Sequence, residues 1–273
     1  MSPAHVAVPS WIGVGASVVL VGVAAAIAAR QRLGVTRELL IAAARSAVQL
    51  VAVGAVLGLL FVHAGILGAL GWVTAMVLIA GQVAARRGAG VPAAARCATV
   101  GVAVGATATL GVLLVLRVIS AEARVIVPVG GMVVSGAMQA SAVVLRRVRE
   151  QAVDSRAQVE ARLALGLPAE QAFAPHLRSA LRTALIPNID GTKVVGLISL
   201  PGAMTGLILA GVAPLTAIRY QVVVMWMLLA AAALSGLVTA RLAQRALFDP
   251  AHRLRPVPAA PVRRPFAFRF RRA

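Results

Sequence analysis

Long apolar stretches separated by short basic connections dominate this chain of 273 residues. Hydrophobic residues make up 60% of it and charged residues 13%, whereas an ordinary soluble domain is about 25% charged. A helix needs about 20 predominantly apolar residues to cross a bilayer. Seven stretches come near that length, at residues 10–29, 46–62, 65–85, 97–116, 125–145, 194–211 and 218–240. The sequence therefore predicts an all-α polytopic membrane protein with about seven transmembrane helices and no room for a separate catalytic domain.

Basic residues fall almost entirely on alternate connections between these stretches. The connections 30–45, 86–96 and 146–193, together with the tail from residue 241, hold 24 of the 27 Lys and Arg residues. The remaining three are Arg117, Arg124 and Arg219. Because cytoplasmic loops are enriched in Lys and Arg, this distribution predicts an N-terminus outside and a C-terminus in the cytoplasm. The net charge of +19 then reflects membrane topology, and we expect no nucleic-acid partner.

The absence of certain residues and motifs disfavours several functions for this chain. No ionisable residue lies in the middle of a predicted span, although proton-coupled carriers need one there. Lys193 follows Gly191 and Thr192 in the wrong order for a phosphate-binding loop. One Cys and four scattered His do not predict a metal cage, and metal ligands stay unknown. We expect no catalytic residue and no cofactor in this chain, so uphill transport would need energy from another chain.

Pairs of glycines four residues apart occur in three of the predicted spans. This spacing lets helix backbones approach closely, and it predicts a tight bundle with a subunit contact made by helices. The pairs are Gly54 and Gly58, Gly101 and Gly105, and Gly202 and Gly206.

The segment 146–193 is the only long connection, and its pattern predicts two helices. The first runs from the basic residues at 146–149 to Leu165 and is broken by Gly166 and Pro168. The second runs over 169–185 and ends at Pro187, with apolar residues every four positions. These residues are Phe173, Leu177, Leu181 and Leu185. Such an amphipathic helix lies on a membrane surface or docks into a groove of a partner.

One short motif favours docking onto a partner. Glu160 and Ala161, followed by Gly166, are similar to the E-A-A-x-x-x-G loop with which ABC importers contact their ATPase, although Arg162 replaces the second alanine. A short helix between two bends can transmit motion without melting. We therefore predict an ATPase coupling site formed by Glu160, Gly166, Phe173, Leu177 and Leu181.

Four stretches resemble the Fet-type iron-export ABC transporter permeases, which are related to the plant aluminium-tolerance permeases. They read RSAVQLVAVGAVLGLLF at 45–61, PVGGMVVSGAM at 128–138, ALIPNID at 184–190 and GLISLPGAMTGLILAGVAPLTAIRYQ at 196–221. The resemblance covers roughly residues 30–248. It implies the permease subunit of an ABC exporter in the cell inner (plasma) membrane, moving iron or another metal out of the cytoplasm. It also implies a permease homodimer in membrane lipid and a separate ATP-binding subunit that holds ATP and magnesium.

The chain departs from the family pattern at two places. Residues 135–139 read SGAMQ where the family has G-N-x-M-N, and residues 201–207 read PGAMTGL where it has P-G-M-M-T-G-Q. Two amides and one thioether are therefore missing. The substrate stays open between iron, another metal, a nucleotide sugar and a lipid-like molecule.

Thioether, amide and phenol side chains near the spans form the predicted substrate pathway. Methionine sulfur is a soft ligand that prefers Cu(I), whereas iron prefers harder donors, and Met in a bundle also serves as adaptable packing. Pro201 and Gly202 are expected to break the sixth span, as broken helices do at transport sites. The predicted pathway residues are Gln49, Met132, Met138, Gln139, Pro201, Gly202, Met204, Tyr220 and Gln221.

The organisation that follows is a single transmembrane permease domain at 1–248 and a basic tail at 249–273, expected to be disordered on the membrane surface. Two alternatives to an ABC permease stay open. One is a membrane scaffold or stress-response protein without transport, and the other is a channel or uncoupled carrier.

Overall fold

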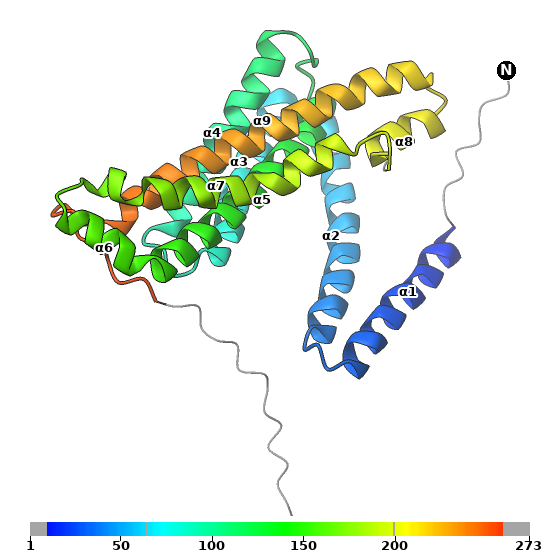
Figure 1. The fold of residues 1–273 in the computed structure, drawn as a ribbon. Coiled ribbons are helices and arrows are strands. Elements are labelled where there is room, and N and C mark those ends of the chain that lie inside the picture. The colour runs from blue at the N-terminus through cyan, green and yellow to red at the C-terminus, as the bar shows by residue number, and fades with distance from the viewer. Residues whose placement is uncertain (1–9, 64, 199, 259–273) are drawn as a thin grey trace, which may run out of the picture. The chain divides into compact units, whose positions relative to one another are not determined.

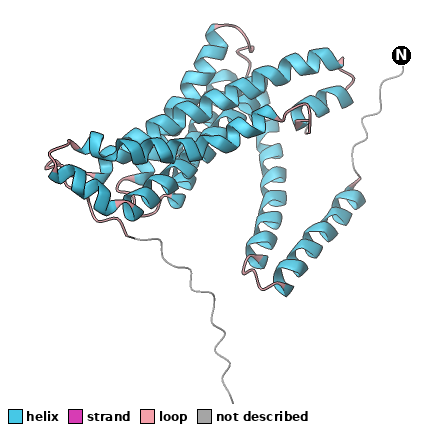
Figure 2. Cartoon of the chain, in the orientation of Figure 1, coloured by secondary structure: helices cyan, strands magenta, loops and turns pink. Residues whose placement is uncertain are grey.

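The computed structural model of this protein describes residues 10–63, 65–198 and 200–258. Over these residues the chain is nearly all helical, with nine helices and no β-strand (Figures 1 and 2). The helices are α1 (Trp11–Arg30), α2 (Thr36–His63), α3 (Gly65–Arg87), α4 (Ala94–Val115), α5 (Ala123–Asp154), α6 (Arg156–Ala164), α7 (Ala169–Lys193), α8 (Gly202–Leu209) and α9 (Pro214–Leu247).

Six of the described helices are long and apolar enough to cross a membrane: α1, α2, α3, α4, α5 and α9. Each contains or closely overlaps one predicted span, which confirms the all-α polytopic membrane fold. The orientation of these helices in the bilayer stays a prediction.

The sixth predicted span, 194–211, is not a continuous helix. Residues 194–198 form turns, Gly196 takes a positive φ of 84°, and α8 has only eight residues. Proline cannot donate a backbone hydrogen bond to a preceding turn, so Pro201 separates the two parts. The predicted break at Pro201 and Gly202 is therefore confirmed.

The chain divides into two compact units, and the smaller one contains α1 and α2. These two helices pack against each other, and Arg32 and Gly34 take positive φ values of 52° and 71° in the turn that joins them. No residue is buried in the apolar window Thr36–Gly58 of α2. The smaller unit by itself therefore does not cover these apolar side chains.

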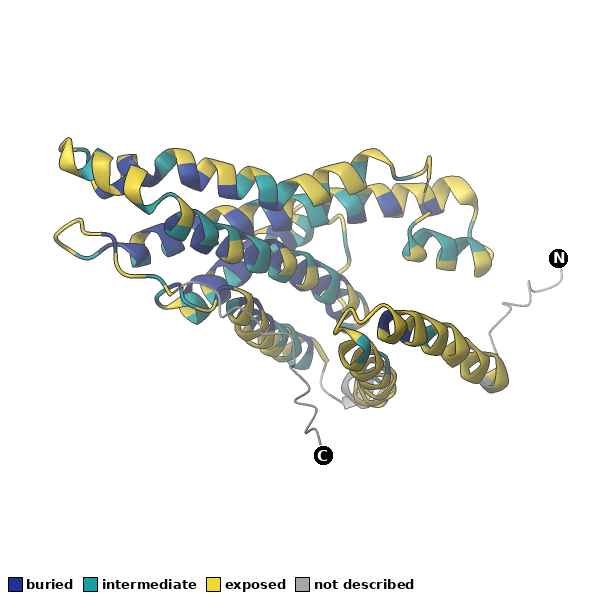
Figure 3. Cartoon of the chain, turned by 60° about the horizontal axis from the view of Figure 1, so that its bottom comes forward, coloured by how far each residue is buried: buried dark blue, intermediate teal, exposed yellow. Residues whose placement is uncertain are grey.

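The larger unit contains a four-helix core made by α3, α4, α5 and α9. Val102, Val133, Ala137 and Ala231 are fully buried in it. Helix α9 packs against both α4 and α5, and Figure 3 shows buried residues along the inner faces of this bundle.

Two glycines allow α4 and α9 to touch. A Cβ atom on Gly101 would lie 2.9 Å from the carbonyl oxygen of Ser235, and one on Gly105 would lie 2.8 Å from the Ser235 Cβ. Both distances are shorter than real Cβ contacts, so only glycine fits. This confirms a close helix approach at the 101/105 pair. The other two predicted glycine pairs have no atom within 4 Å of such a Cβ and stay predictions for a subunit contact.

Hydroxyl groups on the same stretch of α9 bond to α5. Ser235 Oγ donates to the carbonyl oxygen of Ala137 at 3.2 Å, and Thr239 Oγ1 donates to Ser141 Oγ at 3.0 Å. Ser235, Thr239 and Ser141 are fully buried. Hydrogen bonds between helices satisfy polar groups that would be costly to bury alone. Ser141 is thus a packing residue.

Helices α5 and α9 are longer than a bilayer requires. Their 32 and 34 residues correspond to about 48–51 Å at 1.5 Å per residue, against a hydrocarbon core of about 30 Å. Their last turns form a second apolar core with α6 and α7, in which Val148, Phe173 and Leu247 are fully buried. We call this arginine-rich part of the larger unit the basic end; it lies around α6 in Figure 1.

The segment 146–193 differs from its predicted form in two respects. The first predicted helix is divided at Ser155 into the end of α5 and the nine-residue α6. The second does not stop before Pro187, because α7 continues through Pro175 and Pro187 to Lys193. A proline inside a helix removes one backbone hydrogen bond, and packing of α7 against α5 and α9 offsets that loss. The predicted break at Gly166, which takes a φ of 84°, is confirmed.

The predicted disordered tail begins with a turn that packs one residue, Leu254, into the basic end. Leu254 is buried, pairs its backbone with Phe248, and belongs to the core of the basic end. The N–H of Arg255 donates to the carbonyl oxygen of Leu247 at 2.8 Å. Leu254 therefore anchors the start of the tail in the core of the basic end, and disorder of the tail as a whole stays a prediction. Residues 259–273 of the predicted tail lie outside the described part.

A buried histidine ties α5, α6 and α7 together. His176 Nε2 lies 3.3 Å from an Arg162 guanidinium nitrogen, and its Nδ1 lies 3.2 Å from Gln151 Oε1. A guanidinium can only donate, so Nε2 accepts, and the proton lies on Nδ1, which donates to Gln151. Burial lowers the pKa of His176, and the positive charge of Arg162 lowers it further. The neutral imidazole is the form that fits.

Replacing Gly105 by alanine should destabilise the four-helix core. The new methyl group would meet Ser235 and the carbonyl oxygen of Ala231, and overpacking of this kind costs about 1–3 kcal/mol. We expect the thermal midpoint of the purified protein in detergent to fall by several degrees. Gly111→Ala is the matched control on α4, since nothing lies within 4 Å of its added Cβ. Equal midpoints for the two variants would contradict the close contact between α4 and α9.

His176 should make the fold less stable in acid. Because its pKa is lowered in the folded state, the unfolded chain binds the proton more readily. The stability that depends on the neutral ring is therefore complete above the ordinary pKa of about 6.5 and is lost as the pH falls below it. His176→Gln keeps a donor and an acceptor but cannot titrate. Its thermal midpoint should change less than that of the natural protein between about pH 7.5 and pH 5.5, and an identical change would refute this role.

Candidate functional site

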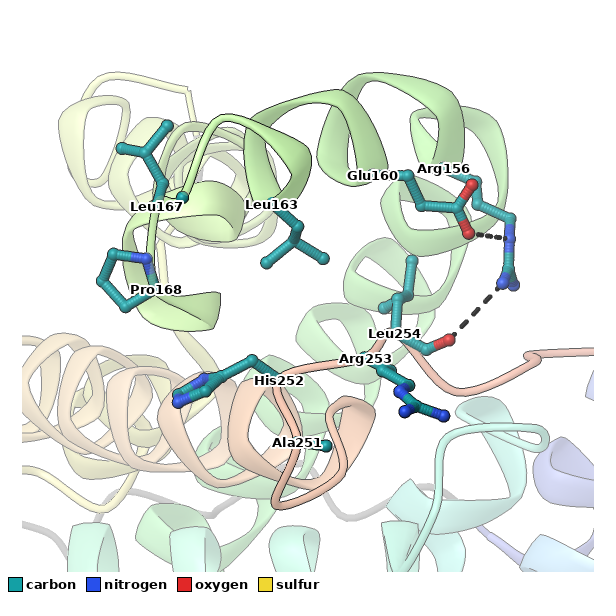
Figure 4. A pocket seen from close by; sticks show the side chains of 10 residues that line it. Arg156, Glu160, Leu163, Leu167, Pro168, Ala251, His252, Arg253 and Leu254 are labelled. Carbon is teal, nitrogen blue, oxygen red and sulfur yellow. Dashed lines mark hydrogen bonds and ion pairs between the residues drawn. The ribbon is translucent and has the colours of Figure 1, made fainter.

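An open groove at the basic end contains two of the predicted coupling residues. It has a volume of about 720 Å³ and lies between α6, the turn that follows it and the C-terminal segment (Figure 4). We call it the coupling groove. Its lining is Arg156, Glu160, Leu163, Gly166, Leu167, Pro168, Ala251, His252, Arg253 and Leu254.

An arginine joins the two sides of the coupling groove. Arg156 Nε lies 2.8 Å from a carboxylate oxygen of Glu160, and another guanidinium nitrogen of Arg156 donates to the carbonyl oxygen of Leu254 at 3.4 Å. Figure 4 marks both interactions. The side chains of this ion pair are about half exposed, so solvent weakens their attraction. They leave charged and hydrogen-bonding groups at the groove's edge that a partner can contact.

The turn between α6 and α7 presents one apolar side chain to solvent. Leu165, directly before Gly166, is 81% exposed. The backbone N–H of Gly166 donates to the carbonyl oxygen of Leu163 at 2.9 Å, and its positive φ favours glycine. The α6–α7 corner is thus a rigid turn with an exposed leucine at its tip.

The other predicted coupling residues do not face the groove. Phe173 and Leu177 are buried in the core of the basic end, with Phe173 fully covered, and Leu181 is half-buried against the same core. The rings of Phe173 and Phe248 meet edge to face at 6.1 Å. The apolar stripe of α7 binds α5 and α9 of its own chain, so the prediction that Phe173 and Leu177 contact a partner directly was wrong. The periodicity indicated burial correctly but did not identify the covering surface.

A second hollow lies where the chain turns from α7 through α8 into α9. It has a volume of about 380 Å³, and we call it the bend cavity. Its lining is mostly apolar and contains no charged residue. The lining residues are Thr192, Val195, Gly196, Leu200, Met204, Ile218, Gln221, Val222, Met225 and Trp226.

Gln221 is the unusual side chain of the bend cavity. It is 4% exposed, and its amide oxygen Oε1 has no hydrogen-bond partner among the residues that the structure describes. Leaving a buried acceptor unpaired costs about 1–3 kcal/mol. Functional sites carry such costs more often than structural ones do. The free oxygen can accept a hydrogen bond or coordinate a cation that enters the cavity.

Two thioethers share the cavity with this amide, those of Met204 and Met225. Met225 follows Gln221 by one helical turn and therefore lies on the same face of α9. Sequence reasoning missed it, although this spacing could have revealed it. Among the described residues no group of three or more His, Cys, Asp or Glu could hold a metal ion. The side-chain donors available here are two soft sulfur atoms, the neutral amide oxygen of Gln221 and the hydroxyl of Thr192, which itself donates to the carbonyl oxygen of Asn188 at 2.8 Å.

The structure brings together only part of the predicted pathway. Met204 and Gln221 share the bend cavity, and Pro201 and Gly202 lie at the start of α8 beside it. Met132 packs against the four-helix core. Tyr220 lines a different hollow with Arg219 and Val118.

Three predicted pathway residues lie elsewhere. Gln49 is exposed on α2 in the smaller unit. Met138 and Gln139 line a groove between α3 and α5, together with Arg87 and Arg146. Adjacent positions on a helix point about 100° apart. The adjacent residues Tyr220 and Gln221 therefore line different hollows, whereas Met138 and Gln139 share one groove.

Comparison with known proteins supports one family over most of the chain. Residues 11–248 match the profile of the family described as "Uncharacterised protein family (UPF0014)". The UPF0014 membrane protein STAR2 of Oryza sativa subsp. japonica is 41% identical over 239 residues, which cover 88% of this chain and 84% of that protein. No solved structure matches the chain significantly.

Two further relatives carry functional names. The probable iron export permease protein FetB of Escherichia coli (strain K12) is 33% identical over 87% of this chain and 92% of its own length. Protein ALUMINUM SENSITIVE 3 of Arabidopsis thaliana is 35% identical over 88% of each chain. With this coverage and six membrane-spanning helices, the chain belongs to the UPF0014 family of multi-pass membrane proteins.

Proposed function

We propose that this protein is the permease subunit of an ABC exporter and that a separate ATPase chain, holding ATP and magnesium, supplies the energy. The α6–α7 corner is the observation that carries the proposal. Glu160 lies on the short helix α6, and the exposed Leu165 and the turn residue Gly166 follow directly after that helix. The relative named as a probable iron export permease supports the same assignment.

The construction around the corner suits a mechanical contact. Helix α6 packs on α7, and α7 packs on α5 and α9, two helices long enough to cross the membrane. The buried core of the basic end has few ways to deform, because protein interiors are close-packed. A push on the corner would therefore move the packed part of α7, up to Ala184, as a body.

Two copies of the chain and two ATPase chains form the complex in this proposal. The apolar window of α2 has no buried residue, and that of α1 is only 11% buried. Such faces require a cover of lipid or protein. A second permease chain against this smaller unit would supply part of it.

The cargo in this proposal is iron or another metal, and it passes the bend cavity. The name of the FetB relative favours iron. The cavity's donors, two thioethers and a free amide oxygen, favour a softer cation such as Cu(I), because hard cations select carboxylate and carbonyl ligands. A direct comparison of metals is therefore the useful experiment.

Leu165→Ser should weaken ATPase docking without unfolding the permease. The tagged chain would be purified from its native membranes, its ATP-binding partner identified by mass spectrometry, and the ratio of the two chains measured. Removing an exposed apolar side chain at an interface centre costs about 2 kcal/mol, a loss of roughly thirtyfold in affinity. Leu33→Ser, in the exposed turn after α1, is the control.

Phe173→Ala separates docking from folding in the same assay. Phe173 is fully buried, and removing a buried aromatic ring costs about 3–5 kcal/mol, so this variant should lower the thermal midpoint as well as recovery. Undiminished ATPase recovery with Leu165→Ser would exclude the corner as the docking site. A purified chain that yields no ATP-binding partner at all would argue against the ABC permease assignment.

Gln221→Leu should reduce transport while the fold remains stable. The substitution removes a buried acceptor that has no partner, so the thermal midpoint should stay level or rise. ATP-dependent uptake of iron, and separately of Cu(I), would be measured in proteoliposomes that contain the permease and its ATPase, against an ATPase that cannot hydrolyse ATP. We expect uptake of the true cargo to fall at least tenfold.

Gln244→Leu is the matched control for this experiment. Gln244 is also a buried glutamine of α9, but its amide donates to the carbonyl oxygen of Glu170 at 3.0 Å. Its loss should lower the thermal midpoint and leave transport per folded complex unchanged. Full transport by Gln221→Leu would remove the bend cavity from the pathway. Metal flux without ATP would indicate a channel instead.

A further inference from the structure

A groove between α3 and α5 at the basic end carries two guanidinium groups. It has a volume of about 240 Å³, and we call it the arginine groove. Val83 and Arg87 line it from α3, and Met138, Gln139, Ala142, Val143 and Arg146 line it from α5. All these residues belong to the larger unit.

The arginine groove is polar at one end and apolar along its length. Helices α3 and α5 both run toward the basic end, where Arg87 is the last residue of α3. From Arg146 back to Met138 is about 12 Å along α5, and from Arg87 back to Val83 about 6 Å along α3. Over that distance the walls are valine, alanine and methionine, apart from the amide of Gln139.

The arginines at the polar end outnumber the acidic side chains that pair with them. Arg146 and Arg147 both pair with Glu150, at 3.5 Å and 2.8 Å, whereas Arg87 has no ion pair in the described part of the chain. The side chain of Arg146 is 49% exposed, so it remains available to a ligand. An anion that reaches the groove would meet two guanidinium groups, which bind phosphate oxygens in a planar, bidentate manner.

This arrangement selects among possible ligands. Both arginines repel a metal cation, which disfavours Met138 and Gln139 as cation ligands. A free anion would use the guanidinium groups but not the apolar walls. A molecule with a phosphate head and a hydrocarbon chain uses both. The groove is formed by α3 and α5, both of which are long and apolar enough to cross a membrane. Phospholipids, which have a phosphate head and hydrocarbon chains, surround such helices.

We propose that the arginine groove binds an anionic phospholipid. Its phosphodiester contacts Arg87 and Arg146, and one acyl chain lies along Val83, Ala142 and Val143. Basic pockets between transmembrane helices recognise lipid headgroups in this way. The proposal is independent of the transported cargo and of the ATPase, because it concerns a face that neither the coupling groove nor the bend cavity includes.

The test uses the full chain in detergent, with lipid binding measured by native mass spectrometry. Phosphatidylglycerol is the anionic probe and phosphatidylcholine of the same acyl composition is the zwitterionic one. We expect the natural chain to prefer phosphatidylglycerol. Each arginine near an anionic lipid contributes roughly fivefold in affinity, so Arg87→Gln combined with Arg146→Gln should reduce phosphatidylglycerol binding by at least tenfold.

Two further variants separate this site from general electrostatics. Arg178→Gln with Arg182→Gln removes the same charge from two exposed positions of α7 and should keep the preference. Val83→Phe enlarges a side chain that is 41% exposed on the groove wall. It should obstruct the acyl chain and weaken lipid binding while leaving the charge unchanged.

Three results would overturn the proposal. One is equal binding of the two lipids by the natural chain, and a second is an equal loss for both pairs of arginine variants. The third is full displacement of phosphatidylglycerol by inorganic phosphate with no effect of Val83→Phe, which would identify a simple anion site. Thermal midpoints measured for every variant keep a folding defect from being read as a loss of binding.

Discussion

The close contact of α9 with α4 and α5 is the constraint on which the larger unit depends. On one side, Gly101 and Gly105 offer no side chain, so the backbone at Ser235 can approach α4. On the other, the hydroxyls of Ser235 and Thr239 bond to α5. In a bilayer, apolar burial gives little drive for association, because lipid tails are as apolar as leucine. Close packing and hydrogen bonds must provide it, and both are concentrated on one stretch of α9.

The basic end is built on the two helices that this contact positions. The ends of α5 and α9 form the second core, and α6, α7 and the segment up to residue 258 close around it. The coupling groove therefore rests on a packed base, although the sequence there is rich in arginine. The buried Arg149 is satisfied locally, because it donates to the carbonyl oxygen of Ala89 at 2.9 Å.

The positions of most helices could be predicted from the sequence, but the surfaces against which those helices pack could not. Six spans could be predicted because about 20 apolar residues in a row have few other uses, and Gly166 and Pro201 broke helices as expected. Pro187 did not, because tertiary packing on α5 and α9 outweighs the lost hydrogen bond. The apolar periodicity from Phe173 to Leu181 correctly predicted that this face of α7 is buried, but it did not predict that α5 and α9 of the same chain cover it. Met204 and Gln221 meet across the bend, whereas Met138, on a neighbouring helix, faces arginines; only three-dimensional structure separates these cases.

Helix α7 extends from the coupling groove, which Pro168 lines directly before it, to the bend cavity, which Thr192 lines near its end. The two residues are about 36 Å apart along the helix axis. Pro187 lies between the anchored half of α7 and the cavity. Because proline has no N–H, the carbonyl oxygen of Thr183 lacks its usual helical donor. Bending α7 at Pro187 breaks one backbone hydrogen bond fewer than bending it at a residue with an N–H. The helix that connects the coupling groove to the bend cavity therefore has a point of easier bending next to the cavity.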